Sequence, residues 1–228
     1  MQLTRTLYIL MIVCLLVVAP LRAQEQQEEM RPPVESGPFL KTDLVELVKF
    51  DPTLRLDIRY ATSNNFLSRP VYTEARAFLQ RPAARALRRV NRSLRRKGYG
   101  LIIFDGYRPW SVTKIFWDST PEEKRAFVAD PRLGSRHNRG CAVDLTLFDL
   151  KTGQPLKMPS DYDDFSERAH PDYKGGTIEE RRNRDMLRAA MEAEGFTVYE
   201  NEWWHFDYKD WKRYAILNIS FSEAAARN

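Results

Sequence analysis

The stretch from Ser135 to Leu147, SRHNRGCAVDLTL, constrains the fold of this chain more than any other. Its second half alternates apolar and polar residues from Val143 onward, and Asp144 is the first polar residue of that alternation. Because successive side chains of a strand point to opposite faces of a sheet, the pattern predicts a strand that carries Asp144 on the face opposite its apolar side chains.

Two of the three histidines in the chain stand near acidic residues. His137 precedes Asp144 by seven positions, and His205 ends the string Glu202-Trp203-Trp204-His205. Each residue alone has a structural explanation, as a loop histidine, a paired aspartate or part of an aromatic core patch. Together, two His, one Asp and one further Glu are the parts of a catalytic zinc site, with three protein ligands, an open position for water and a carboxylate that accepts a proton.

The N-terminal residues Met1–Ala23 have the pattern of a secretory signal peptide. Arg5 supplies the positive charge, Leu7–Ala19 is an apolar run too short for a comfortable membrane span, and Ala23 is a small residue at the expected cleavage point. An uncleaved membrane anchor is the alternative. We expect an exported, periplasmic protein without stable membrane insertion after cleavage.

The segment 24–38 is polar and contains prolines, which predicts a flexible leader. Residues 39–228 are enough for one domain with one core. The formal net charge of +5 falls to about +3 without the two arginines of the signal peptide, and basic residues are interspersed with acidic ones. With no nucleic-acid-binding motif in view, we expect no nucleic-acid partner and interpret the basic run 88–97 as a solvated helix face.

Periodicity and capping signals predict an α+β fold. Helices are expected over Pro82–Lys97, which Gly98 ends, and over Thr177–Glu194, which opens with a capping box. A short helix over Ser111–Trp117 would have Ser111 as its cap. The predicted fold is a single domain with a mainly antiparallel central sheet, flanked by the two long helices, and a zinc cleft at the sheet. Further strands are expected over Leu44–Phe50, Leu54–Tyr60, Leu101–Phe104 and Phe196–Tyr199.

The spacing of Glu202 and His205 requires a local irregularity. Residues three apart share a face on a helical turn but point oppositely on a regular strand, so a shared metal requires a turn, bend or bulge there. Cys141 is expected to be a small packed residue rather than a ligand or nucleophile. His170 is expected to be a loop histidine outside the site.

The two motifs together resemble the D-Ala-D-Ala dipeptidases, which belong to a zinc peptidase group that also includes D,D-carboxypeptidases and some phage endolysins. The resemblance covers most of Phe39–Tyr208, and the Glu-Trp-Trp-His form favours the dipeptidase branch. The matching segments are Ser135-x-His137-x-x-Gly140-x-Ala142-x-Asp144, Glu202-Trp203-Trp204-His205, Arg59/Tyr60-Ala61-Thr62 with Asn65-Phe66, Asp105-Gly106-Tyr107-Arg108-Pro109, and Asp163 with Glu167-Arg168.

The resemblance implies one zinc ion per chain, held by His137, Asp144 and His205. It also implies that Glu202 is the general base and proton shuttle and that Arg108 stabilises the developing oxyanion. Elementary chemistry gives the same division of labour for Glu202, because it would be the one carboxylate that is not a ligand.

For the substrate, the resemblance implies that Ser135 helps to hold the carboxylate and that Asp163 pairs with the free ammonium. Asp161 and Asp164 are neighbours that could take the place of Asp163. Charged groups at both ends would reject longer peptides, because a longer chain leaves one of them buried and unpaired.

The implied function is hydrolysis of D-Ala-D-Ala to two D-alanines. Since the resistance-type dipeptidases lack an export signal, a role in cell-wall peptide turnover is expected here. The nearest alternative is a D,D-carboxypeptidase or endopeptidase acting on peptidoglycan stem peptides. An alternative of another class is a non-catalytic wall-binding module that keeps zinc as a structural element.

Overall fold

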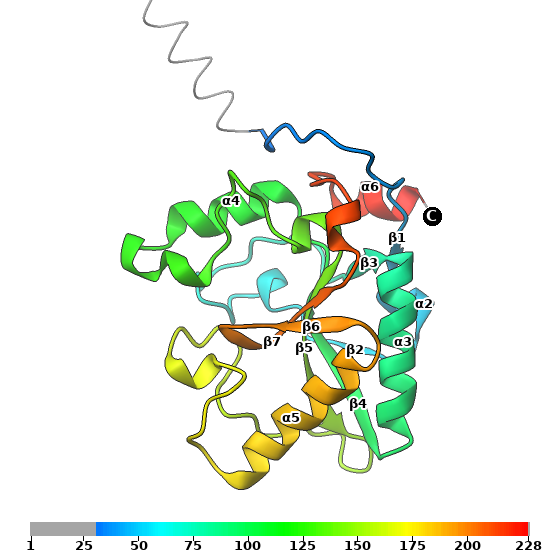
Figure 1. The fold of residues 1–228 in the computed structure, drawn as a ribbon, viewed down its shortest axis with the longest axis vertical. Coiled ribbons are helices and arrows are strands. Elements are labelled where there is room, and N and C mark those ends of the chain that lie inside the picture. Colours follow the sequence, from blue (N-terminus) through cyan, green and yellow to red (C-terminus); the bar gives the residue numbers. More distant parts are fainter. Residues whose placement is uncertain (1–30, 228) are drawn as a thin grey trace, which may run out of the picture. The chain divides into compact units, whose positions relative to one another are not determined.

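A computed structural model describes residues 31–227, so the predicted signal peptide lies outside the described residues. The main element is a five-stranded sheet in the order β2-β4-β5-β7-β6 (Figure 1). Its strands are β2 (Arg55–Leu56), β4 (Tyr99–Asp105), β5 (Ala142–Asp149), β6 (Phe196–Tyr199) and β7 (Glu202–Tyr208).

Three of the four strand pairings in this sheet are antiparallel, as the sequence predicts. The exception is the short edge strand β2, which pairs in parallel with β4. The sheet is therefore mixed rather than purely antiparallel, and β5, which carries Asp144, lies at its centre.

Two long helices, α3 (Arg81–Arg95) and α5 (Ile178–Glu192), cover one face of the sheet. They agree with the predicted helices to within one or two residues, and the predicted capping box of α5 is present. Their apolar side chains form one core with the odd-numbered residues of the central strands. The fully buried members include Leu87, Val90, Leu101, Ile103, Val143, Leu145, Leu147, Leu187 and Met191.

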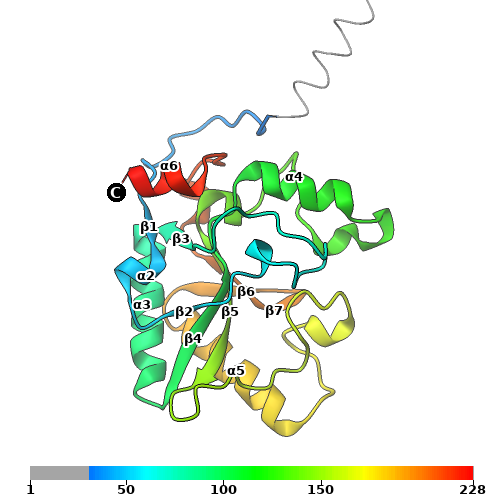
Figure 2. The same cartoon turned by 180° about the vertical axis from the view of Figure 1, so that it is seen from behind.

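The opposite face carries the polar residues that the alternation predicts. Asp144 and Thr146 of β5 project there, beside Ile102 and Phe104 of β4. Viewed from behind, this face lies under the segment that contains the short 3-10 helix η1 (Arg59–Ala61) (Figure 2). Helix α4 (Trp110–Ser119) follows β4 on the same side as the loops that enclose the site.

Three local predictions need correction. Residues Leu44–Phe50 form a short strand, β1 (Leu44–Glu46), and one helical turn, α2 (Leu47–Phe50). Strand β1 pairs with β3 (Phe78–Gln80) in a separate two-stranded sheet, a long-range pairing that no local sequence pattern predicts.

The other two corrections concern element boundaries. Only Arg55–Leu56 of the predicted strand Leu54–Tyr60 is extended in a sheet. Helix α4 begins one residue before Ser111, which therefore cannot be its N-cap.

The predicted leader 24–38 falls partly within the described residues. There the Glu35 carboxylate accepts hydrogen bonds from Arg139 and from the backbone N–H of Ile216, so contacts with the domain begin before Phe39. At the other end, α6 (Phe221–Ala226) packs against β1. Over residues 31–227, no helix has both the length and the apolar character that crossing a bilayer requires.

Candidate metal centre and substrate cavity

Three elements bring His137, Asp144 and His205 together. Asp144 on β5 and His205 on β7 are direct partners across the antiparallel pair. His137 opens the 3-10 turn η3 (His137–Arg139), which ends at Gly140 with φ +65°. The left-handed backbone at Gly140 favours glycine, and a Cβ there would lie 2.4 Å from Leu44 Cδ2, so a larger residue would also displace the Leu44 side chain.

The facing atoms of the three residues form a tight triangle. Asp144 Oδ1 lies 3.3 Å from His137 Nε2 and 3.0 Å from His205 Nδ1, and the two ring nitrogens are 3.1 Å apart. All three residues are buried. Among the described residues, this is the group of His, Cys, Asp and Glu side chains whose geometry could hold a metal ion.

Hydrogen bonds on the outer side of each imidazole show that the triangle is suited to a cation. His137 Nδ1 donates to the Gly106 carbonyl at 2.7 Å, and His205 Nε2 donates to Asp207 Oδ1 at 3.0 Å. In a neutral imidazole the other nitrogen then carries a lone pair. Two ring lone pairs and the buried Asp144 Oδ1, which accepts no hydrogen bond, therefore converge on one point, and this donor set fits zinc.

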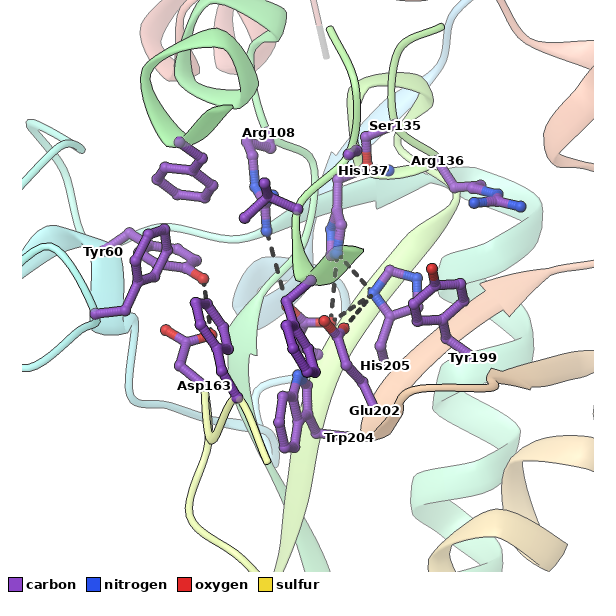
Figure 3. A pocket seen from close by; sticks show the side chains of 17 residues that line it. Tyr60, Arg108, Ser135, Arg136, His137, Asp163, Tyr199, Glu202, Trp204 and His205 are labelled. Carbon is purple, nitrogen blue, oxygen red and sulfur yellow. Dashed lines mark hydrogen bonds and ion pairs between the residues drawn. The ribbon is translucent and has the colours of Figure 1, made fainter. Parts of the chain in front are cut away.

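Glu202 lies beside the triangle without belonging to it. Its Oε2 is 3.7 Å from His205 Nδ1 (Figure 3). The irregularity that its spacing from His205 requires is present: between Val198 and Tyr199, the β7 partner changes from Phe206 to Glu202. Burial raises the pKa of Glu202 to about 7, so its carboxyl group can exchange a proton near neutral pH.

Arg108 reaches the cavity from the loop after β4. Its Nε and Nη2 both donate to Asp105 Oδ2, at 2.9 and 2.7 Å, and Nη2 lies 3.9 Å from Asp144 Oδ2. The guanidinium also lies over the rings of Tyr60 and Phe116. Although burial opposes the charge, the neighbouring Asp105 carboxylate outweighs it and raises the pKa of Arg108, which therefore remains a fixed cation.

Asp163 lies on the other side of the cavity from Ser135 (Figure 3). Its Oδ1 accepts a hydrogen bond from Tyr60 Oη at 3.0 Å, while its buried Oδ2 has no partner. Burial, followed by the nearby Asp144 and Glu202 carboxylates, raises the pKa of Asp163 well above its usual range. An unpaired buried carboxylate oxygen of this kind can be satisfied by a bound cationic group.

Ser135 lines the same cavity at the start of the His137 turn. Its hydroxyl accepts the backbone N–H of His137 at 3.1 Å and retains its own hydrogen for donation. The cavity has a volume of about 100 Å³. Every residue that the sequence assigns to the metal, the chemistry or the substrate lines it: Arg108, Ser135, His137, Asp144, Asp163, Glu202 and His205.

The structure separates several residues from this site. Asp161 and Asp164 line a neighbouring depression instead of the cavity, which leaves Asp163 as the aspartate that faces the metal triangle. Cys141 is fully buried, and burial raises the pKa of its thiol, in keeping with a packing role. His170 is absent from the cavity lining.

Other functional contacts could not be assigned from the sequence. Tyr162 donates from its hydroxyl to Asp144 Oδ2 at 2.9 Å, and the ring of Phe127 stacks on that of Phe165 at 5.0 Å. The ring centroids of Phe66 and Phe165 are 5.3 Å apart, so three separate segments of the chain build one aromatic wall of the cavity. The position of Asp207 two residues after His205 was a usable signal, because such residues share a face on a strand.

Comparisons with known sequences agree with this geometry. A family model described as D-ala-D-ala dipeptidase, Peptidase M15, matches residues 40–225. A D-alanyl-D-alanine dipeptidase of Escherichia coli is 34% identical over 181 residues, covering 79% of this chain and 92% of the relative. One from Enterococcus faecalis is 36% identical over 178 residues, covering 69% of this chain and 87% of the relative.

Solved structures give more distant likenesses. The vancomycin-resistance D,D-dipeptidase VanXYg, in complex with a D-Ala-D-Ala phosphinate analogue, is 20% identical with a TM-score of 0.38, over 82% of this chain and 76% of that one. The LdcB LD-carboxypeptidase is 18% identical with a TM-score of 0.41, over 84% and 80%. The assignment follows from the sequence matches: this chain belongs to the D-Ala-D-Ala dipeptidase family and is a metallopeptidase.

Proposed function

We propose that this protein hydrolyses D-Ala-D-Ala to two D-alanines with one zinc ion held by His137, Asp144 and His205. The observation that carries the proposal is the shared cavity. One small cavity joins a metal triangle, an unliganded glutamate, a fixed arginine and an unpaired buried carboxylate. A purely structural zinc site has no use for the last three groups.

The chemistry divides among the side chains as follows. Zinc supplies Lewis acidity and lowers the pKa of a coordinated water toward ~7. Glu202, the carboxylate beside the triangle that is not one of its ligands, accepts the proton of the attacking water and passes it to the leaving amine. Arg108 is held by Asp105 next to Asp144, where its charge stabilises the oxyanion that develops on the substrate carbonyl.

The ends of the dipeptide are recognised on opposite sides of the cavity. Asp163 pairs with the substrate ammonium through its unpartnered Oδ2, while the Ser135 hydroxyl donates to the substrate carboxylate. A peptide extended at its amino end replaces the ammonium with a neutral amide and leaves Asp163 buried and unpaired, which disfavours longer substrates.

The test is D-alanine release by the purified protein without residues 1–23. D-Ala-D-Ala, L-Ala-L-Ala and a stem pentapeptide ending in D-Ala-D-Ala are offered side by side, before and after chelation and with zinc added back. Release from D-Ala-D-Ala, lost on chelation and restored by zinc, is the expected result. Comparable release from the pentapeptide would assign the protein to the D,D-carboxypeptidase branch. No release from any substrate by the zinc-loaded protein would refute the proposal and favour a binding module.

The biological setting that we propose is turnover of wall-derived D-Ala-D-Ala outside the cytoplasm. The support is the signal-peptide pattern of Met1–Ala23. Fractionation of the native host with an antibody against the domain tests it. The expected result is a periplasmic protein shortened at its N-terminus, whereas full-length protein in the cytoplasm would overturn it.

A further inference from the structure

The second hydrogen bond of His205 comes from its own strand. Asp207 is two residues farther along β7, so both side chains project from the same face, and Oδ1 of Asp207 accepts from His205 Nε2 at 3.0 Å. The Asp207 side chain is 14% exposed. The opposite ring nitrogen, Nδ1, faces Asp144 and His137.

This contact decides which nitrogen of His205 can bind a metal. A neutral imidazole has one N–H and one lone pair, and the acceptor of the N–H fixes the tautomer. His137 is fixed by a backbone carbonyl, that of Gly106. His205 depends on a side chain, so its tautomer and ring orientation can be changed by a single substitution.

Arg136 forms an ion pair, without a hydrogen bond, with the other oxygen of Asp207. Its Nε lies 3.4 Å from Asp207 Oδ2, and its guanidinium lies over the Trp211 ring at 4.9 Å. In Figure 3 the Arg136 side chain extends past His205, away from Arg108 and Glu202. Because Arg136 immediately precedes His137, the ion pair joins the turn that carries one histidine to the strand that carries the other.

We propose that Asp207 is a positioning residue of the metal site, which fixes His205 with its Nδ1 lone pair toward the triangle, and that the ion pair with Arg136 gives Asp207 additional support. The inference rests on the metal site of the proposed function, but not on the identity of the substrate. The competing explanation is that Asp207 is only a strand residue, since it pairs with Ala142 and Thr197 across the sheet. In that case its replacement changes stability and leaves metal affinity unchanged.

The experiment measures the zinc dissociation constant by competition with a chromophoric chelator, together with the melting temperature of the metal-free protein. The variants are Asp207→Ala, Asp207→Asn and Arg136→Gln. Asp210→Asn is the matched control, because this nearby carboxylate has Arg213, at 3.9 Å, as its ion-pair partner and makes no contact with His205.

Asp207→Ala is expected to weaken zinc binding by about 10- to 100-fold, the usual effect of losing the acceptor of a ligating histidine. Asp207→Asn keeps a carbonyl acceptor, so its loss is smaller, and Arg136→Gln gives the smallest loss of the three. Asp210→Asn binds zinc as the wild type does. Unchanged affinity in folded Asp207→Ala, or an equal loss in Asp210→Asn, would overturn the proposal.

A measurement on the unaltered protein remains decisive even if a variant fails to fold. Nitrogen-15 NMR of the zinc-loaded wild type reports which ring nitrogen of His205 is protonated. A protonated Nε2 and a metal-bound Nδ1 are expected, and the reverse assignment would refute the proposal. Both readouts are independent of turnover, so a protein that binds zinc as described but does not cleave D-Ala-D-Ala would disprove the proposed function and not this inference.

Discussion

Asp144 and His205 are direct partners in the antiparallel pair of β5 and β7, and Asp144 Oδ1 lies 3.0 Å from His205 Nδ1. Two of the three candidate metal ligands are therefore positioned by the backbone hydrogen bonds of the sheet itself. The third, His137, is held by a turn whose own end depends on Gly140. All three side chains are buried, so the site is preorganised by the sheet and by this turn.

Metal removal should lower stability without unfolding the protein, because the core on the helical face does not depend on the ion. A ligand that binds only the native state at about 100 times its dissociation constant adds about 2.7 kcal/mol. We expect a lower melting temperature after chelation that zinc restores. Calorimetry checks this, and an identical melting temperature with and without zinc would contradict it.

Glu202→Gln should abolish most of the activity while leaving the metal bound. Gln cannot accept a proton, and loss of a general base typically lowers kcat by about 10²- to 10⁴-fold. Zinc content by atomic absorption should stay at one per chain. Glu200→Gln, at an exposed position two residues earlier, is the control and should behave as the wild type. Retained activity in Glu202→Gln would remove this residue from the chemistry.

Arg108→Lys should lower kcat/KM by about 10²- to 10³-fold, the cost of losing one oxyanion donor. Lysine keeps the charge beside Asp105 but cannot repeat the two hydrogen bonds to its Oδ2. Steady-state kinetics on D-Ala-D-Ala check the prediction. Arg55→Lys is the control, because Arg55 donates to Gly153 and lies over Phe148, outside the cavity. An equal effect of both substitutions would point to general destabilisation.

Asp163→Asn should make the protein more stable near neutral pH and less active. The folded-state pKa of Asp163 is raised above its usual 3.8, so the folded state binds more protons than the unfolded state above that pH. The free energy of unfolding of the wild type therefore falls as the pH rises from 3.8 toward the raised pKa of Asp163. The Asn variant has no titrating group at this position and does not lose this stability. Urea denaturation across the acid-to-neutral range measures the difference, which should grow with pH.

The same variant should raise KM by about 10- to 100-fold, because it removes the charged partner of the substrate ammonium. Asp164→Asn serves as the control, since Asp164 lines the neighbouring depression. An Asn variant at position 163 that is less stable at neutral pH, or that has an unchanged KM, would contradict the assignment.

Gly140→Ala should cost more stability than Gly98→Ala. Both glycines have positive φ, +65° and +88°, so both substitutions carry a conformational cost of about 1–2 kcal/mol. Only Gly140 has a neighbour, Leu44 Cδ2, within clashing distance of an added Cβ, while Gly98 has open space. Chemical denaturation measures the free energy of unfolding of both variants, and the difference between their losses gives the steric contribution at Gly140. Equal losses of unfolding free energy would show that the Leu44 side chain moves aside at little cost.

Much of the fold is predictable from sequence because local signals agree with one another. The apolar periodicity of α3, the capping box of α5 and the alternation of β5 each predict the right type of element. The pairing of β1 with β3 is different, because it joins residues far apart in the chain through backbone hydrogen bonds that leave no local pattern.

The residues of the candidate site also fall into those that local sequence signals predict and those that they do not. The ligands and Glu202 stand in recognisable motifs, but the residues that support them are identified by spatial contact. Asp105 accepts hydrogen bonds from Arg108, and Tyr162, in the loop between β5 and α5, donates one to the second oxygen of Asp144. Such contacts depend on the course that a loop takes over the sheet, and the composition of the loop does not predict that course.

The aromatic wall of Phe66, Phe127 and Phe165 has a consequence for how this protein can change over evolutionary time. Its members belong to three segments outside the strands that carry the candidate ligands Asp144 and His205. Insertions or substitutions in these segments can reshape the cavity while β5 and β7 keep their register. Descendants of one ancestor can therefore acquire different substrate ranges without rebuilding the chemistry.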